Sequence, residues 1–267
     1  MNRKKISIFT NETEISLQVK EMLSQKLKGH GHDVSEDDSK DSDLIVIIGG
    51  DGAFLRTMHK FGFPACPVVG INTGHLGFFQ EILPEDVDRF IAEYENDNYT
   101  IQDLNTVQCS ILTEDGAKNS HLALNEITIK GEKSYSVHLY ISIAGKPIEK
   151  FSGDGILVAT AAGSTAYNYS LGGSIVDPRL KLLQVTPIAP MNTTAYRSFT
   201  SSLLLPADLS IGVVPEKRDT SICVSYDSNV AVYSGVKEIS LTLSDEVVHL
   251  VRFKDYDFWN KVKDKFL

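Results

Sequence analysis

A glycine-rich turn that carries a single carboxylate, Gly49-Gly50-Asp51-Gly52, offers the clearest chemistry in this 267-residue sequence. The turn follows an apolar run at residues 44–48 and precedes a helix expected at about 53–60. Glycines let a backbone turn sharply and approach a ligand closely, and the first N–H groups of a helix attract phosphate. Neither GxxxxGK nor GxGxxG is present, so the turn is no Walker loop and no dinucleotide fingerprint. We therefore expect Gly49, Gly50 and Gly52 to form a phosphate loop of another kind.

The carboxylate of Asp51 stands out in that turn, because it repels the phosphates that the glycines attract. One interpretation is that it accepts the proton of an attacking hydroxyl, or holds a metal ion that neutralises the phosphates. The other interpretation is that it merely caps the following helix. The tetrapeptide alone leaves both open.

A second loop, Asn72-Thr73-Gly74-His75-Leu76-Gly77-Phe78, follows a strand expected at Val68–Ile71. Ligands of open α/β sheets bind beyond the carboxyl ends of the strands, so this loop and the glycine turn are expected to face one crevice. Asn72 and His75 are possible ligand contacts there. A lone histidine in a turn, however, is more often a local hydrogen-bonding residue than a catalyst.

The dipeptide Asn125-Glu126 interrupts a strand-like segment, between apolar runs at 122–124 and 127–129. Polar residues in a buried strand need partners, and the hydroxyls of a sugar would supply them. The alternative is a bulge or a strand edge that faces water.

A stretch rich in small and hydroxyl residues extends from Gly153 to Gly173. Such a segment lets the backbone lie against a flat ligand, with Thr165 and Ser170 as hydrogen-bonding groups. Tyr167 either packs on a ring of that ligand or fills the core.

Strands and helices alternate in the first third of the chain, which predicts a parallel α/β sheet. In that region Asn11 and Glu14 resemble a capping box at a helix start, and residues 35–43 are expected to form an acidic surface loop. Beyond Tyr99, short alternating apolar runs separated by turn residues are typical of a mostly β domain. The predicted organisation is an N-terminal α/β domain at 1–98, a β-rich domain at 99–253, and an amphipathic helix at 254–267 that packs back on the first domain.

Composition narrows the classes of function. The formal net charge of −9 disfavours nucleic acid as a partner. The three cysteines are far apart and no HExxH is present, so no dedicated protein metal site is expected. No GxSxG nucleophile elbow is present either, so hydrolase chemistry is unsupported. The absence of a signal-peptide core and of a bilayer-length apolar stretch favours a cytoplasmic protein with no membrane partner.

Taken in order along nearly the whole chain, these motifs resemble those of the NAD kinase family. The elements that carry the resemblance are GGDG at 49–52, NTGHLGF at 72–78, Asn125-Glu126, Gly153-Asp154-Gly155, GSTAY at 163–167, LGG at 171–173, Tyr196-Arg197-Ser198 and the Phe258-Trp259 tail. The resemblance implies a Rossmann-like N-terminal α/β domain and a C-terminal mostly-β domain, with the active site in the cleft between them. It also implies transfer of the γ-phosphoryl group of ATP to the 2′-hydroxyl of the adenosine ribose of NAD, which gives NADP.

The resemblance also implies roles for individual residues. Asp51 matches the proton acceptor, and Gly52 matches a substrate contact. Asn125 and Glu126 match residues that bind the ribose region of NAD, and Asp154 matches one near the nicotinamide amide. The other implied substrate contacts are Ser152, Thr165, Ala166, Tyr167, Asn168, Tyr169, Ser170 and Ala189, with Asp227 as a possible one.

The family pattern further implies a divalent ion, Mg²⁺ or Mn²⁺, that accompanies ATP, polyphosphate as a donor in some members, and a homodimer or homotetramer. The sequence departs from that pattern at Ala53, at Ala161-Ala162, at Ser152 (arginine in some relatives) and at Asp227-Ser228-Asn229. These changes concern affinity and donor preference more than the reaction. Two alternatives stay open at this point: a GGDG-type lipid kinase and a catalytically silent NAD(P)-binding regulator.

Overall fold

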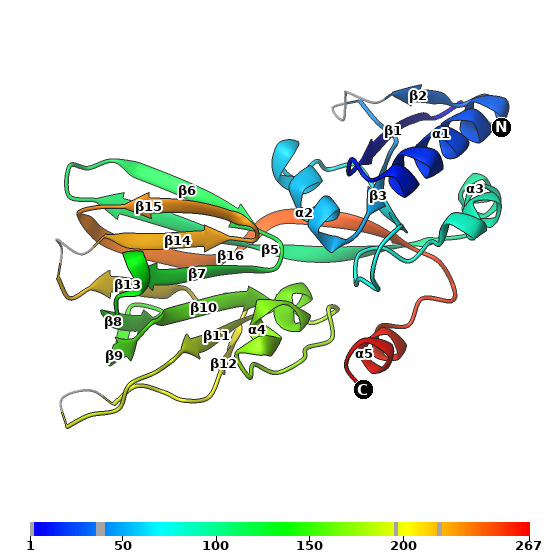
Figure 1. Ribbon diagram of the computed structural model, residues 1–267. Coiled ribbons are helices and arrows are strands. Elements are labelled where there is room, and N and C mark those ends of the chain that lie inside the picture. The colour runs from blue at the N-terminus through cyan, green and yellow to red at the C-terminus, as the bar shows by residue number, and fades with distance from the viewer. Residues whose placement is uncertain (1–2, 36–40, 195–196, 218–220) are drawn as a thin grey trace. The chain divides into compact units, whose positions relative to one another are not determined.

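A computed structural model describes residues 3–35, 41–194, 197–217 and 221–267 of the chain (Figure 1). The chain divides into two compact units: Met1–Asp103 with Val247–Leu267, and Leu104–Glu246. These divisions fall a few residues from the expected boundaries at 98/99 and 253/254. Most of the acidic loop expected at 35–43, and Tyr196 of the family motif, lie outside the described residues.

The first unit is built on a parallel sheet. Its strands run in the order β2 (Asp33–Ser35), β1 (Lys5–Thr10), β3 (Leu44–Gly49), β4 (Val68–Asn72) and the last part of β16 (Val236–Arg252). Every residue of β3 is buried, as its uninterrupted apolar run predicts for a strand covered on both faces. The carboxyl ends of β3 and β4 thereby bring the two glycine-containing loops to one edge of the sheet.

Helices cover both faces of that sheet. One face packs against α1 (Glu14–Gly29) and α3 (Val87–Glu95), which follows the short helix η1 (Pro84–Asp86), while α2 (Asp51–Lys60) lies on the other side (Figure 1). The expected capping box at Asn11 is wrong. Thr13 is the N-cap residue of α1, and Asn11, which directly follows β1, instead accepts a hydrogen bond from the Thr13 hydroxyl at 2.9 Å.

The second unit consists almost entirely of antiparallel strands. One sheet runs in the order β12-β11-β10-β7-β14-β15, and the other joins the first part of β16 to β13, β8 and β9, with β5 and β6 alongside. The bounds are β5 (Thr100–Thr113), β6 (Lys118–Ala123), β7 (Glu126–Gly131), β8 (Val137–Ile143), β9 (Lys146–Gly153), β10 (Gly155–Thr160), β11 (Leu182–Ile188), β12 (Leu203–Pro206), β13 (Ile211–Pro215), β14 (Ile222–Tyr226) and β15 (Asn229–Tyr233). Short helices η2 (Glu132–Ser134), η3 (Ala162–Thr165) and α4 (Tyr167–Ser170) complete it.

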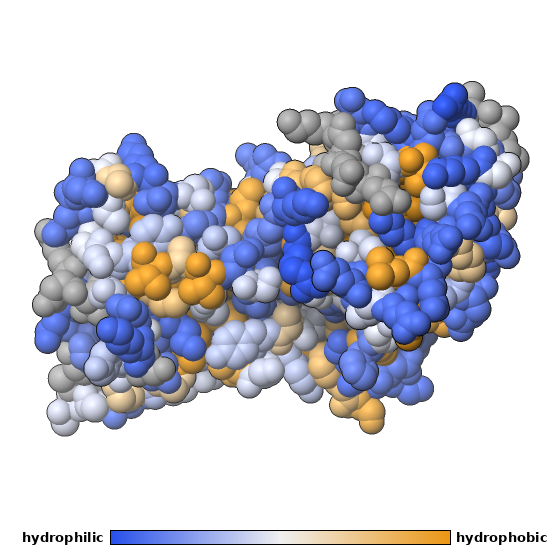
Figure 2. Space-filling model, turned by 45° about the horizontal axis from the view of Figure 1, so that its top comes forward, coloured by the Kyte–Doolittle hydropathy of each residue, from blue (hydrophilic) through white to orange (hydrophobic). Residues whose placement is uncertain are grey.

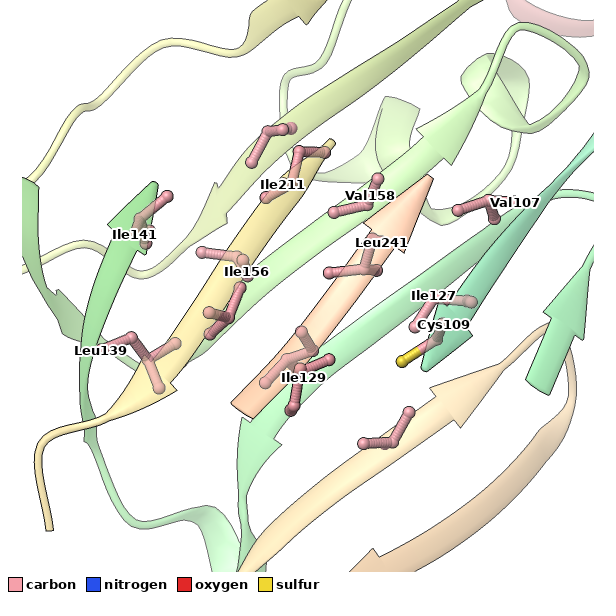
Figure 3. Close-up of a cluster of buried hydrophobic side chains, with 14 of the residues drawn as sticks. Val107, Cys109, Ile127, Ile129, Leu139, Ile141, Ile156, Val158, Ile211 and Leu241 are labelled. Atoms are coloured by element: carbon pink, nitrogen blue, oxygen red, sulfur yellow. The ribbon is translucent and has the colours of Figure 1, made fainter. Parts of the chain in front are cut away.

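Alternating apolar side chains of these strands form one large core. Figure 3 draws 14 of its members and labels ten, from β5, β7, β8, β10, β13 and β16, with their side chains pointing toward one another. The predicted fold class, an α/β domain joined to a mostly β domain, is therefore confirmed. The last element, α5 (Phe258–Phe266), belongs to the first unit, where the ring of Phe78 lies 5.7 Å from that of Phe258.

The surface gives no sign of a membrane-crossing helix. Within the described residues, no helix is both long enough and apolar enough to span a bilayer. On the face shown in Figure 2, hydrophobic residues form small separate groups among hydrophilic ones.

Candidate active site

The glycine turn at the end of β3 is shaped by close packing. Gly49 has φ +149°, and a Cβ there would lie 2.6 Å from the Cβ of Ala53, so a larger residue would collide with the start of α2. Gly50 is the N-cap residue of that helix, and no side chain caps it. Asp51 is the first residue of α2, and Gly52 beside it is exposed. The helix N-terminus thus opens next to the carboxylate.

The Asp51 carboxylate is held by the second loop rather than by its own helix. Its Oδ2 accepts the backbone N–H of Phe78 at 3.0 Å, and its Oδ1 accepts that of Phe79 at 3.1 Å. A Cβ at Gly77 would lie 2.3 Å from Oδ1, so only glycine lets the loop approach this closely. Both carboxylate oxygens are oriented, while the residue itself stays half-buried and therefore accessible.

The two possible contacts in that loop differ in their surroundings. Asn72 is buried, and its Oδ1 accepts the N–H of Gly74 at 3.0 Å, which folds the loop after β4. His75 is exposed. The structure therefore places Asn72 as a support of the loop and leaves His75 free to meet solvent or a ligand.

Cations behind this loop are a feature that the sequence analysis missed. Arg252, Lys261 and Lys265 donate hydrogen bonds to its backbone carbonyls. The available signal was weak, because lysines near the end of a helix are ordinary surface residues. Only the spacing of Lys261 and Lys265, one turn apart on α5, indicated that they share a face.

In the second unit, Asn125 and Glu126 lie at the start of β7 with buried side chains. Asn125 Oδ1 and Glu126 Oε2 have no hydrogen-bond partner among the described residues. Burial, with a smaller contribution from the nearby Asp227 carboxylate, raises the pKa of Glu126 to about 8. A buried amide oxygen and a buried carboxyl oxygen without partners are costly, so this is a site built to meet hydrogen-bonding groups from outside the chain.

The backbone of that dipeptide is firmly held. The Asp227 carboxylate, in the turn between β14 and β15, accepts the N–H groups of Leu124 and Asn125 at 2.9 and 2.8 Å. Asp227 itself has φ +50°, a conformation that aspartate tolerates better than most residues. A Cβ at Gly163 would lie only 2.0 Å from the Asn125 carbonyl oxygen. The orphaned acceptors therefore stand on a rigid support.

The segment expected to wrap a dinucleotide has both exposed and buried members. Tyr167, Tyr169 and Ser170 are exposed, Ala166 is half-buried, and Thr165 is 9% exposed. Asn168 is fully buried, and its Oδ1 accepts the Thr186 hydroxyl at 2.6 Å. The structure thus gives Asn168 an internal partner and leaves its neighbours open to a ligand.

Three further expected contacts gather at the ends of β9 and β11. Asp154 is exposed, and its N–H donates to the Ile188 carbonyl at 3.0 Å, next to Ala189. Ala189 is exposed and has φ +44°. Ser152 is 1% exposed, and its N–H donates to the Ser198 hydroxyl at 2.9 Å. Asp154 and Ala189 are thus open to a ligand, whereas Ser152 is enclosed.

The α/β unit has a helix N-terminus beside an oriented carboxylate, and the β unit has buried oxygens without hydrogen-bond partners. Together these features are typical of a phosphotransferase that binds a hydroxyl-bearing substrate. Comparison with known proteins gives the family. Residues 3–99 match the ATP-NAD kinase N-terminal domain, and residues 124–253 match the ATP-NAD kinase C-terminal domain. The chain therefore belongs to the NAD kinase family of phosphotransferases.

Individual relatives agree over almost the full length. The chain is 40% identical over 272 residues to the NAD kinase of Finegoldia magna, covering 100% of this chain and 99% of that protein. It is 32% identical over 249 residues to the NAD kinase of Staphylococcus saprophyticus, covering 92% of each. The structure of an NAD kinase from Archaeoglobus fulgidus in complex with ATP matches with a TM-score of 0.76 and 26% identity, over 97% of this chain and 98% of that one. Yeast NADH kinase complexed with NADH shares the fold, with a TM-score of 0.84 at 20% identity over 98% and 87% of the two chains.

Proposed function

We propose that Asp51 orients and deprotonates the adenosine 2′-hydroxyl of NAD while the γ-phosphoryl group of ATP is transferred to it, giving NADP. The observation that carries this role is the two-point hold on its carboxylate by the N–H groups of Phe78 and Phe79, beside the free N-terminus of α2. In a loose phosphoryl-transfer transition state the hydroxyl proton leaves late, so orientation of the acceptor matters more than its basicity. A carboxylate fixed through both oxygens suits that requirement.

The substrate-binding part of the proposal concerns the second unit. The orphaned oxygens of Asn125 and Glu126 fit the hydroxyl groups of a ribose diol, which can both donate and accept hydrogen bonds. The exposed members of the 165–170 segment, with Asp154 and Ala189, would contact the rest of the dinucleotide. Asn168, Asp227 and Ser152 would act behind them, because their side chains or backbones already serve internal hydrogen bonds.

The phosphate donor would meet the backbone N–H groups at Gly50 and Gly52. Among the residues that the structure describes, no group of three or more His, Cys, Asp or Glu side chains is arranged to hold a metal ion. A divalent ion, Mg²⁺ or Mn²⁺, would accompany the phosphates of ATP and offset their charge. Polyphosphate offers the same chemistry as a second donor.

Assembly and compartment belong to the same proposal. The alternate exposed residues Val230 and Val232 give edge strand β15 an apolar side, which supports a homodimer or homotetramer. Three free cysteines are compatible with a cytoplasmic location. Light scattering of the purified protein would measure the assembly directly.

Incubation of the pure protein with NAD, ATP and Mg²⁺ tests the reaction. We expect NADP, detected with an NADP-specific dehydrogenase, and ³¹P NMR should place the new phosphate on the 2′-oxygen. NAD binding without NADP formation would instead indicate a silent regulator. The same assay with polyphosphate, and with NADH in place of NAD, defines donor and acceptor preference.

A further inference from the structure

The loop from Leu76 to Gln80 is held from two opposite sides. On one side its N–H groups face the Asp51 carboxylate. On the other side its carbonyl oxygens face cations from the C-terminal part of the chain. All of these residues belong to the first unit.

Two consecutive peptide groups connect the two sides. The Gly77 carbonyl accepts a hydrogen bond from Lys261 Nζ at 3.1 Å, and the N–H of the same peptide group, on Phe78, donates to Asp51 Oδ2 at 3.0 Å. The next group repeats the arrangement: the Phe78 carbonyl accepts from Arg252 Nη2 at 3.1 Å, and the Phe79 N–H donates to Asp51 Oδ1 at 3.1 Å. In a trans peptide the C=O and N–H point in opposite directions, so each group joins one cation to one carboxylate oxygen.

We propose that Lys261 is a positioning residue for phosphoryl transfer, which acts through the Gly77–Phe78 peptide group to orient the Asp51 carboxylate. The inference rests on the role proposed for Asp51. A donor on the carbonyl oxygen polarises the peptide group and strengthens the hydrogen bond that its N–H makes. Lys261 also contacts the Gln80 carbonyl, so one ammonium group fixes the loop at two points.

Arg252 and Lys261 differ in how firmly their charges are anchored. Arg252 pairs with Glu81 at 3.1 Å and donates to Gln102 at 2.8 Å. Burial, assisted by repulsion from Arg252 and by a smaller effect of Lys265, lowers the pKa of Lys261 to about 8 against the opposing attraction of Glu81 and Asp51. The Tyr256 ring also faces Lys261, at 5.6 Å from Nζ. As pH rises, Lys261 therefore loses its charge before Arg252 does.

Lys265 provides a matched control on the same helix. Its Nζ donates to the Leu76 carbonyl at 2.6 Å, one peptide group earlier in the same loop. The N–H of that group belongs to Gly77 and is not one of the two that hold Asp51. Lys265 is exposed, whereas Lys261 is partly buried, and the Nζ of Lys265 also lies 5.4 Å from the centre of the Phe78 ring. Loss of Lys265 removes a cation and a loop contact, while both peptide groups that hold Asp51 keep their own donors.

The test compares Lys261→Met, Lys261→Arg and Lys265→Met in the full-length protein, with kcat, KM for NAD and Tm measured for each. We expect Lys261→Met to lower kcat about 10-fold or more with KM for NAD unchanged, since misplaced catalytic groups cost rate rather than binding. Lys261→Arg should recover most of the loss, and Lys265→Met should lower kcat much less than Lys261→Met does. Equal kcat in the two methionine variants would overturn the proposal.

A pH series decides the matter even where Lys261→Met folds poorly. The kcat of the wild type should fall as pH rises through about 8, where Lys261 loses its proton, and Lys261→Arg should move that fall upward by at least one pH unit. An unmoved alkaline limb in Lys261→Arg contradicts the inference. Asp51→Asn separates the two proposals. Undiminished turnover of Asp51→Asn removes the role proposed for Asp51, and the role of Lys261 with it. Lost turnover of Asp51→Asn, together with an unmoved alkaline limb in Lys261→Arg, removes only the role of Lys261.

Discussion

The two units each present one prominent carboxylate, in opposite surroundings. Asp51 has both oxygens hydrogen-bonded, and two cations, the buried Arg252 and the half-buried Lys261, lie close enough to interact with it. Glu126 has an oxygen without a partner and a second carboxylate, Asp227, as its neighbour. The carboxyl group of Asp51 thus has all its hydrogen bonds made within the first unit, whereas that of Glu126 in the second unit lacks one. A carboxylate whose hydrogen bonds are all made within the protein is oriented in advance, which suits a group that acts on a reacting atom. A carboxyl group with an unpaired oxygen suits a group that binds substrate.

Removal of the Asp51 carboxylate should have the largest effect on turnover. Asp51→Asn keeps the shape of the side chain but cannot accept a proton, so kcat for NADP formation should fall roughly 10²–10⁴-fold. The Tm should fall by only a few degrees, because Asp51 does not cap α2 and asparagine keeps one of the two acceptors that hold the loop. Steady-state kinetics with thermal melting of the same sample checks both. A variant that loses its fold along with its turnover would point to a structural role instead.

Removal of the unpaired Asn125 oxygen should weaken NAD binding rather than lower turnover. Asn125→Leu is close in volume and deletes the orphaned Oδ1. The Kd for NAD, measured by calorimetry, should rise about 10- to 100-fold, the effect expected from a lost hydrogen bond of about 1.5–3 kcal/mol.

Stability is the control for that variant. Because the free protein bears the cost of an unpaired buried oxygen, a leucine there should not lower the Tm. A lower Tm with unchanged affinity would mean that Asn125 serves the fold and not the ligand.

Two glycines allow the comparison to be made with one kind of substitution. A Cβ at Gly77 would meet Asp51, and a Cβ at Gly163 would meet the Asn125 backbone. Gly77→Ala should therefore lower kcat about 10-fold with little change in the Kd for NAD, and Gly163→Ala should do the reverse. Steady-state kinetics and calorimetry measure kcat and the Kd for NAD of both variants. Equal effects of the two variants on both quantities would refute the separation of catalysis and NAD binding between the two units. Gly29→Ala, in open space at the end of α1 and without a positive φ, controls for the substitution itself.

The sequence predicts local structure well and long-range support poorly. The β3 run and the glycine turn after it are readable because their signals are contiguous. Whether Asp51 caps its helix was undecidable, because the answer lies in N–H groups 27 and 28 residues further along. Asp227 supports Asn125 across 102 residues, and Lys261 reaches Gly77 across 184. No local periodicity reports such contacts, since they exist only once the strands are in register.

The smallest expected effect is a change in how stability depends on pH. In the unfolded chain Glu126 loses its proton near 4.5, but in the folded protein its pKa is about 8. Between these values the folded state keeps a proton that the unfolded state has released, so the wild type should lose stability as pH rises from about 5 to 8. Glu126→Gln carries no titrating group at this position, so its Tm relative to the wild type should rise by several degrees over that range. Asp245→Asn replaces an exposed carboxylate in the same unit and should show no such trend. A Tm difference between Glu126→Gln and the wild type that stays constant with pH would mean that Glu126 is already ionised in the folded protein. The contrast with Asp51 would then lie in hydrogen bonding alone.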